Sequence, residues 1–96
     1  MDYKSEKIIK MKELERTLKS LANKRRLEIV QFLKRNREAS VGELAEAISL
    51  SFRSTSRHLA VLSVADILEK EQRSVQIYYR LHTKKSSTLQ HVLSLL

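Results

Sequence analysis

The stretch SFRSTSRHL, residues 51–59, decides how this chain is interpreted. It holds three serines, one threonine and two arginines, yet the apolar spacing around it predicts a helix. Serine and threonine are mediocre residues inside helices because their hydroxyl groups compete for backbone hydrogen bonds. Two interpretations follow: Ser51 and Ser54 cap and solvate an ordinary helix, or the helix presents hydroxyl and guanidinium groups to a ligand.

The residues around this stretch predict a helix-turn-helix. Ser51 is a suitable N-cap for a helix. The apolar side of that helix consists of Thr55, Leu59 and Leu62. Upstream, Ser40 and Glu43 have the spacing of a capping box, which starts a short helix that includes Ile48. Only residues 49–50 separate the two helices, and so tight a connection is typical of the motif.

Further helices are predicted on either side of the motif. Apolar residues recur at helical spacing over residues 5–21. A second pattern runs from the N-cap Asn23 to about Arg35, where Asn36 is expected to end the helix in a left-handed conformation. From Lys84 onward, a last helix has one apolar face, formed by Leu89, Val92, Leu93 and Leu96.

The segment between the fourth and last helices predicts a β-hairpin. Apolar and polar residues alternate over 75–81, which is typical of a half-buried strand. This strand can pair with residues 67–71 through a turn at 72–74. Because the turn lacks glycine, its tip is expected to be longer or more mobile than a two-residue turn.

The composition favours a single basic domain with a polyanionic partner. The 96 residues carry 19 lysines and arginines against 11 aspartates and glutamates, which gives a net charge of +8. Such a charge favours nucleic acid or an anionic membrane surface, although a merely soluble basic protein is the plain alternative. The absence of cysteine excludes disulfides and thiolate metal sites. No apolar run approaches a membrane span, so we expect a cytoplasmic protein.

Four separated motifs carry a family resemblance: LANKRRLEIVQFL, ELAEAISLS, STSRHLAVL and IYYRL. In this order and at these distances, they resemble the ArsR-type family of small winged-helix repressors across roughly residues 14–82. The resemblance implies a mainly α fold with a small β-hairpin, a winged helix-turn-helix of about five helices and a two-stranded wing. It further implies a homodimer that binds operator DNA, with the helix at 51–65 in the major groove.

The predicted DNA-reading face of that helix lies opposite its apolar stripe. Helical geometry places Arg53, Ser54, Ser56 and Arg57 there, and the sequence has no acid between residues 52 and 65. Guanidinium groups can bridge guanine O6 and N7 or bind phosphates. Ser56 and Arg57 also match the family's contacting positions. Phe52 either meets a thymine methyl group or, as the favoured interpretation, packs against the preceding helix.

Three further cations are predicted to hold the DNA backbone. Arg73, at the tip of the hairpin, is a candidate for a minor-groove or phosphate contact, although it can equally be solvated. Lys24 and Arg26, together with Arg25, form a basic cluster at the start of the second helix. Positive charges at a helix N-terminus oppose the helix macrodipole, so it is hard to assign a purely structural role to all three of Lys24, Arg25 and Arg26.

Metal sensing, cofactor binding and catalysis are not predicted. Some relatives in the family bind soft metals through cysteines, but Ser40 and Gly42 stand at those positions here. His82 and His91 would lie about 13 Å apart on opposite sides of a continuous helix, so they cannot share an ion within one subunit. The sequence contains no phosphate-binding glycine loop and no nucleophile motif, and we therefore expect no enzyme activity and no cofactor.

These observations predict residues 1–96 to be a single winged-helix DNA-binding domain with dimerisation helices near 5–21 and 84–96. The predicted function is a transcriptional repressor that binds a pseudo-palindromic operator in double-stranded DNA as a homodimer. The alternative is a winged-helix protein–protein interaction module without specific DNA binding. An RNA- or membrane-associated basic protein is a third possibility, and the effector stays open.

Overall fold

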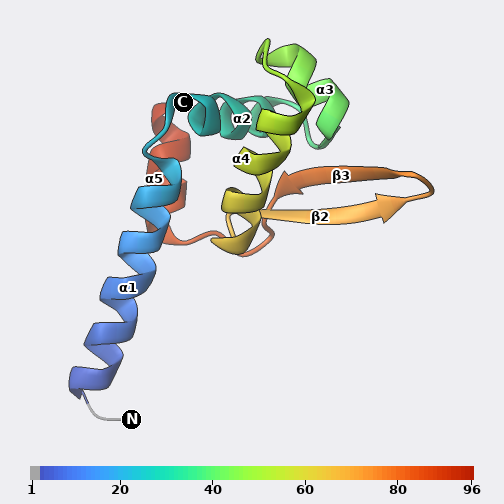
Figure 1. Ribbon diagram of the computed structural model, residues 1–96. Helices are drawn as coiled ribbons and strands as arrows, with labels where there is room; N and C mark the ends of the chain where they lie inside the picture. Colours follow the sequence, from blue (N-terminus) through green and yellow to red (C-terminus); the bar gives the residue numbers. More distant parts are fainter. Residues whose placement is uncertain (1–2) are drawn as a thin grey trace.

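The computed structural model describes residues 3–96; residues 1 and 2 of the predicted domain 1–96 lie outside it. Five helices and a three-stranded antiparallel sheet follow each other along the chain (Figure 1). Their order is α1 (Tyr3–Leu21), α2 (Lys24–Arg35), β1 (Ala39–Ser40), α3 (Val41–Ala47), α4 (Phe52–Val64), β2 (Leu68–Arg73), β3 (Gln76–Leu81) and α5 (Ser87–Leu95). The predicted mainly α fold with a small wing is confirmed.

Side-chain caps fix where the helices of the motif begin. Ser40 Oγ accepts from the Glu43 N–H at 3.2 Å, and the Glu43 carboxylate accepts from the Ser40 N–H at 3.0 Å. This completes the predicted capping box. Ser51 accepts from the backbone N–H of Ser54 at 3.1 Å and caps α4. Local sequence therefore determines the starts of α3 and α4.

The predicted left-handed end of α2 is wrong. Asn36 has φ −120° and ψ 110°, which is extended backbone. Its side-chain amide and its backbone N–H both donate to the carbonyl of Phe32, at 3.1 and 2.8 Å. The carbonyl is thus satisfied without a left-handed residue. Positive φ values among the described residues occur instead at Ser49, Asp66 and Ser74.

The sheet differs from the predicted hairpin in having a third strand and a shorter turn. β1 pairs with β3, so that the strand order is β1-β3-β2. Arg73 pairs with Gln76, which leaves the two-residue turn Ser74–Val75. Ser74 adopts φ 58°, the conformation that glycine usually supplies in such a turn. The expectation of a longer tip, with residues 72 and 73 in the turn, is therefore wrong.

Burial along β3 changes from base to tip. Tyr79 is 7% exposed, as its place in the alternation predicts. Val75 and Ile77, which share that alternation, are 92% and 36% exposed. The hairpin projects beyond the helices (Figure 1), so no helix covers its outer half. Alternation therefore predicts burial correctly only where the sheet meets the core.

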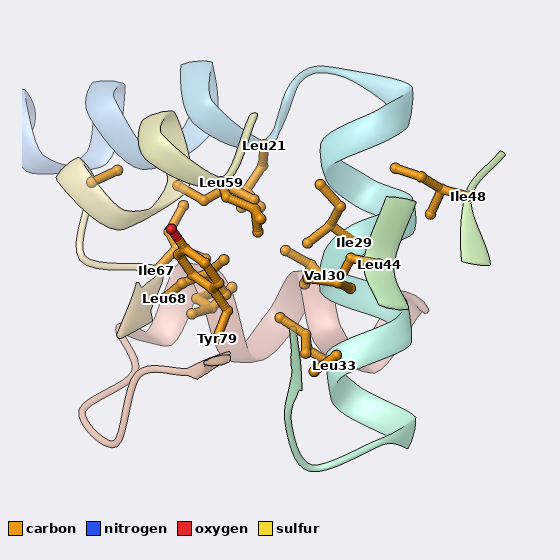
Figure 2. Packing of buried hydrophobic residues seen from close by; sticks show 14 of the residues in the cluster. Leu21, Ile29, Val30, Leu33, Leu44, Ile48, Leu59, Ile67, Leu68 and Tyr79 are labelled. Atoms are coloured by element: carbon orange, nitrogen blue, oxygen red, sulfur yellow. The ribbon is translucent and has the colours of Figure 1, made fainter. Parts of the chain in front are cut away.

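The core lies where α2, α3, α4, α5 and the end of α1 meet the base of the sheet (Figure 2). Its largest fully buried side chains include Ile29, Leu44, Leu59, Leu62, Ile67, Leu68 and Leu89. Leu59 and Leu62 anchor α4, and Ile67 and Leu68 anchor β2 directly after it. The same cluster therefore fixes the wing and α4 relative to each other.

The apolar face of α5 is buried in its own chain. All four of its residues belong to the core cluster or pack against it: Leu89, Val92, Leu93 and Leu96. Lys34 Nζ donates to the Leu93 carbonyl at 2.7 Å, which ties the end of α5 to α2. The prediction that a partner subunit covers this stripe in 84–96 is therefore wrong for Leu89 and Leu93, because periodicity does not show which chain covers a stripe. For the partly buried Val92 and Leu96 it stays a prediction.

The apolar stripe of α1 has no such cover within the chain. Ile8, Met11, Leu14 and Leu18 are 55%, 59%, 39% and 49% exposed. Among residues 6–21 of this helix, only Ser20 and Leu21 at its end are buried. The N-terminal half of α1 extends away from the body of the molecule (Figure 1).

Candidate nucleic-acid interface

The rotation of α4 about its axis is fixed by its buried residues. Thr55, Leu59 and Leu62 are 0% exposed. Thr55 Oγ1 also donates to the Ser51 carbonyl at 2.8 Å, so that its buried hydroxyl has a partner inside the helix. Because these side chains point into the core, the opposite face of α4 has to point outward.

That outward face carries positive charge without compensating acids. Arg53 and Arg57 are both exposed, and Ser54 and Ser56 are half-buried beside them. Neither arginine forms an ion pair with any residue whose side chain is described, 6–96. The structure thus brings together the four predicted reading residues on one side of the first two turns of α4.

The basic cluster at the start of α2 divides into two different roles. Arg26 Nε donates to the Ser20 carbonyl at 2.7 Å, and its Nη1 lies 3.4 Å from His58 Nδ1. Arg25 Nη1 donates to the Ile48 carbonyl at 2.5 Å. These two arginines connect α2 to α1, α3 and α4, so the expectation that they lack a structural purpose is wrong. Lys24 is exposed and, among the described side chains, forms no ion pair.

His58 is held as a neutral ring beside this cluster. Burial lowers the pKa of the His58 imidazole, and the positive charges of Arg26 and Arg25 act in the same direction. A neutral ring leaves Nδ1 free to accept from Arg26, with the proton on the other nitrogen. The contact therefore holds α4 against α2 near neutral pH.

The wing arginines are engaged by carboxylates. Arg73 is the last residue of β2 rather than part of the tip, and its Nη1 and Nη2 donate to the two oxygens of Glu38 at 2.6 and 2.8 Å. Its Nε donates to Glu71 at 2.7 Å, and its guanidinium carbon lies 4.7 Å from the centre of the Tyr78 ring. Arg73 therefore flanks the two-residue turn in ion pairs and is not simply solvated, and its contact with DNA stays a prediction.

The negative charges of the wing carboxylates are compensated by the same arginine contacts. The hydrogen bonds from Arg73 lower the pKa of Glu38 and of Glu71, and Arg80 adds a second donor to Glu71. Arg80 also pairs with Glu69 at 3.1 Å. Arginines therefore pair with all three of these acids, whereas Lys70 of β2 forms no ion pair among the side chains of residues 6–96.

We expect the variant Glu38→Gln to bind duplex DNA more tightly than the wild type, on all sequences alike. Loss of the Glu38 carboxylate frees Nη1 and Nη2 of Arg73 for a phosphate, while Nε stays on Glu71. This contact should make the log–log salt dependence steeper by about 0.9 per wing. Fluorescence anisotropy over a salt series measures this slope. The control is Glu13→Gln, which removes the same charge from an exposed position on α1. Identical slopes for the two variants would contradict the release of Arg73.

Phe52 and His82 have surroundings that the sequence did not specify. Phe52 is 62% exposed and lines a cleft of about 340 Å³ together with Val41 and Gly42 of the preceding helix, so its packing against that helix stays a prediction. His82 lies between β3 and α5, outside any continuous helix, and its Nδ1 accepts from the Lys84 N–H at 3.1 Å. Within the part of the chain that the structure describes, no group of three or more histidine, aspartate or glutamate side chains could hold a metal ion.

Comparison with known proteins places this geometry among DNA-binding regulators. A helix-turn-helix domain model matches residues 21–71. The chain is 41% identical over 64 residues to the arsenic resistance transcriptional regulator ArsR1 of Pseudomonas putida, and 39% identical over 64 residues to the transcriptional activator HlyU of Vibrio cholerae. Each match covers 67% of this chain, and 50% and 58% of the two relatives, so the chain spans about half the length of the curated relatives it matches.

Solved structures extend the similarity to the whole fold. Reduced HlyU from Vibrio cholerae has a TM-score of 0.79 at 32% identity, and the match covers 95% of this chain and 92% of that one. The homodimeric winged helix-turn-helix DNA-binding domain Mb0332 from Mycobacterium bovis has a TM-score of 0.79 at 25% identity, covering 99% of this chain and 82% of that one. Among residues 3–96, no helix is both long and apolar enough to cross a membrane.

Proposed function

The chain belongs to the ArsR family of winged helix-turn-helix transcriptional regulators, and from this premise we propose that it binds a pseudo-palindromic operator as a homodimer and represses transcription. The observation that carries the proposal is that Arg53 and Arg57 lie exposed on a helix without acids and form no ion pair with the side chains of residues 6–96. Such a face suits a polyanion, and a helix is the element that the major groove admits.

The four residues on the outward face of α4 have different proposed tasks. Arg57 and Ser56 read base edges, since a guanidinium can bind O6 and N7 of guanine together and a hydroxyl can approach either a donor or an acceptor. Arg53 and Ser54 lie nearer the capped end of α4, where they position the helix through phosphate contacts. Base contacts supply the sequence preference, and phosphate contacts supply most of the affinity.

The roles that we propose for the other three predicted DNA-binding residues follow from the contacts that each makes within the chain. Lys24 is exposed and contacts a phosphate directly. Arg26 acts through α4, because it donates to Ser20 and contacts His58. Arg73 orders the wing through Glu38 and reaches DNA only when it leaves that carboxylate. Two of the three cations therefore position the interface instead of forming it.

Dimerisation is proposed to occur through α1, whose apolar stripe is exposed in the single chain. A two-fold axis beside this helix would present two copies of α4, and a spacing of about 34 Å would place them in successive major grooves. The homodimeric state of the similar domain from Mycobacterium bovis supports this arrangement. Residues 1–96 then act as one DNA-binding domain in which α1 is the principal dimerisation helix.

The proposed function is tested by the salt dependence of binding to a genomic fragment selected by the purified protein. The dimer should neutralise about 6–10 phosphates, which gives a log–log slope of about −5 to −9. A single-stranded RNA of the same length is the control and should bind more weakly, because the surface offers few aromatic rings for stacking. A flat titration, or a stable complex with another protein and no binding to any duplex, would refute DNA binding. Promoter fusions then test repression: output should fall as the protein is expressed.

A further inference from the structure

Phe52 continues the apolar stripe of α4 beyond the edge of the core. Helical spacing places it one turn before Thr55 and two turns before Leu59, both of which are 0% exposed. Phe52 itself is 62% exposed. A single exposed apolar side chain is common at protein surfaces, so the significance of Phe52 depends on whether it belongs to a larger apolar patch.

The wing tip faces the same cleft with further exposed apolar side chains. Phe52 shares the cleft of about 340 Å³ with Val75 and Ile77 of the wing and with the start of α3 at Val41. Val75 occupies the second position of a two-residue turn and is 92% exposed. Local folding therefore does not account for the apolar character of this side of the cleft.

Arg53 supplies a positive charge next to Phe52, and the acids Glu38 and Glu43 are engaged in hydrogen bonds. Arg53 follows Phe52 directly and is exposed without an ion pair among the described side chains. Glu38 is held by Arg73, and the carboxylate of Glu43 accepts from the Ser40 N–H. An apolar cleft beside an unpaired guanidinium favours a ligand that carries an apolar group next to phosphates.

We propose that Phe52 is a specificity-determining residue that contacts the 5-methyl group of a thymine in the major groove, with Val75 and Ile77 on the opposite wall of the cleft. Thymine is the one base that presents an apolar group in the major groove, and phenylalanine is among the side chains that contact it. The proposal rests on the proposed DNA-binding function and adds a base preference to it. It makes Phe52 a reader of thymine beside the hydrogen-bonding residues of α4.

The test replaces thymine by deoxyuridine, which keeps the base pair and removes only the methyl group. In a duplex selected by the wild-type protein, each thymine of a half-site is replaced in turn, symmetrically in both half-sites. Wild-type protein should lose about fourfold in affinity for each methyl group that it contacts, the loss expected for one methyl-sized apolar group. Phe52→Ala should bind the thymine and deoxyuridine duplexes equally. Phe52→Leu should keep part of the discrimination.

The Arg57→Ala variant is the control, because it should bind more weakly and still prefer thymine. Phe52 is exposed, so its replacement should leave thermal unfolding unchanged, and circular dichroism checks this. Equal wild-type affinities for all thymine and deoxyuridine duplexes would overturn the thymine contact while leaving DNA binding intact. Discrimination that survives in Phe52→Ala would also overturn it, since another residue would then read the methyl group. Failure to bind any duplex would overturn both proposals.

Discussion

Replacing Arg57 by alanine is expected to weaken operator binding by about 1–3 kcal/mol for each half-site, and by twice that for the dimer. The guanidinium of Arg57 is exposed on a face that the buried residues Thr55 and Leu59 hold outward. Truncation removes both hydrogen bonds of a bidentate contact to guanine, because alanine offers no side-chain donor. The O6 and N7 acceptors of the guanine are then left without a hydrogen-bond partner in a desolvated interface.

The loss should be selective for sequence. Affinity for the selected operator fragment and for a random duplex is measured by anisotropy at one fixed salt concentration, and the ratio of the two constants should fall in Arg57→Ala. Arg57→Lys should lose most of this ratio as well, because it keeps the charge but not the two-pronged geometry. Arg35→Ala is the matched control, because Arg35 is an exposed arginine in the last turn of α2 and not on α4. Equal losses on operator and random DNA would assign Arg57 to a phosphate.

Introducing a charge into the stripe of α1 should separate the dimer. Leu14 is 39% exposed and lies between Met11 and Leu18 on the stripe, so Leu14→Glu changes little inside the single chain. In a two-fold interface the change occurs twice, and two unpaired carboxylates meet or are buried at a cost of several kcal/mol. Sedimentation should show a monomer at concentrations where the wild type is a dimer.

Operator binding should fail together with dimerisation in this variant. A monomer engages one half-site and loses the effective concentration that the second subunit provides, commonly a factor of about 10²–10⁴. Glu13→Lys, on the polar side of the same helix, is the control and should remain dimeric. A dimeric Leu14→Glu protein with full operator affinity would contradict dimerisation through α1.

The sequence by itself determined the features that depend on neighbouring residues. The capping box of Ser40 and Glu43, the cap at Ser51 and the buried side of α4 all follow from spacings of a few residues. A hydrogen bond between residues three apart, or a stripe on one helix, needs no information about the rest of the chain. The exposure of the arginines on α4 is predicted in the same way, because once one face of a helix is buried, the residues on the opposite face must be exposed.

Only the tertiary structure decided the features that join distant parts of the chain. Arg73 meets Glu38 35 residues away, and Arg26 meets His58 across 32 residues, so neither partner could be read from local spacing. The same holds for the short strand β1 on β3 and for the apolar face of α5, which α2 and the core cover. An apolar stripe or a cation shows that a partner is needed. Which group supplies it depends on how the chain packs in three dimensions, since ion pairs and buried contacts are properties of distance in space and not of distance along the sequence.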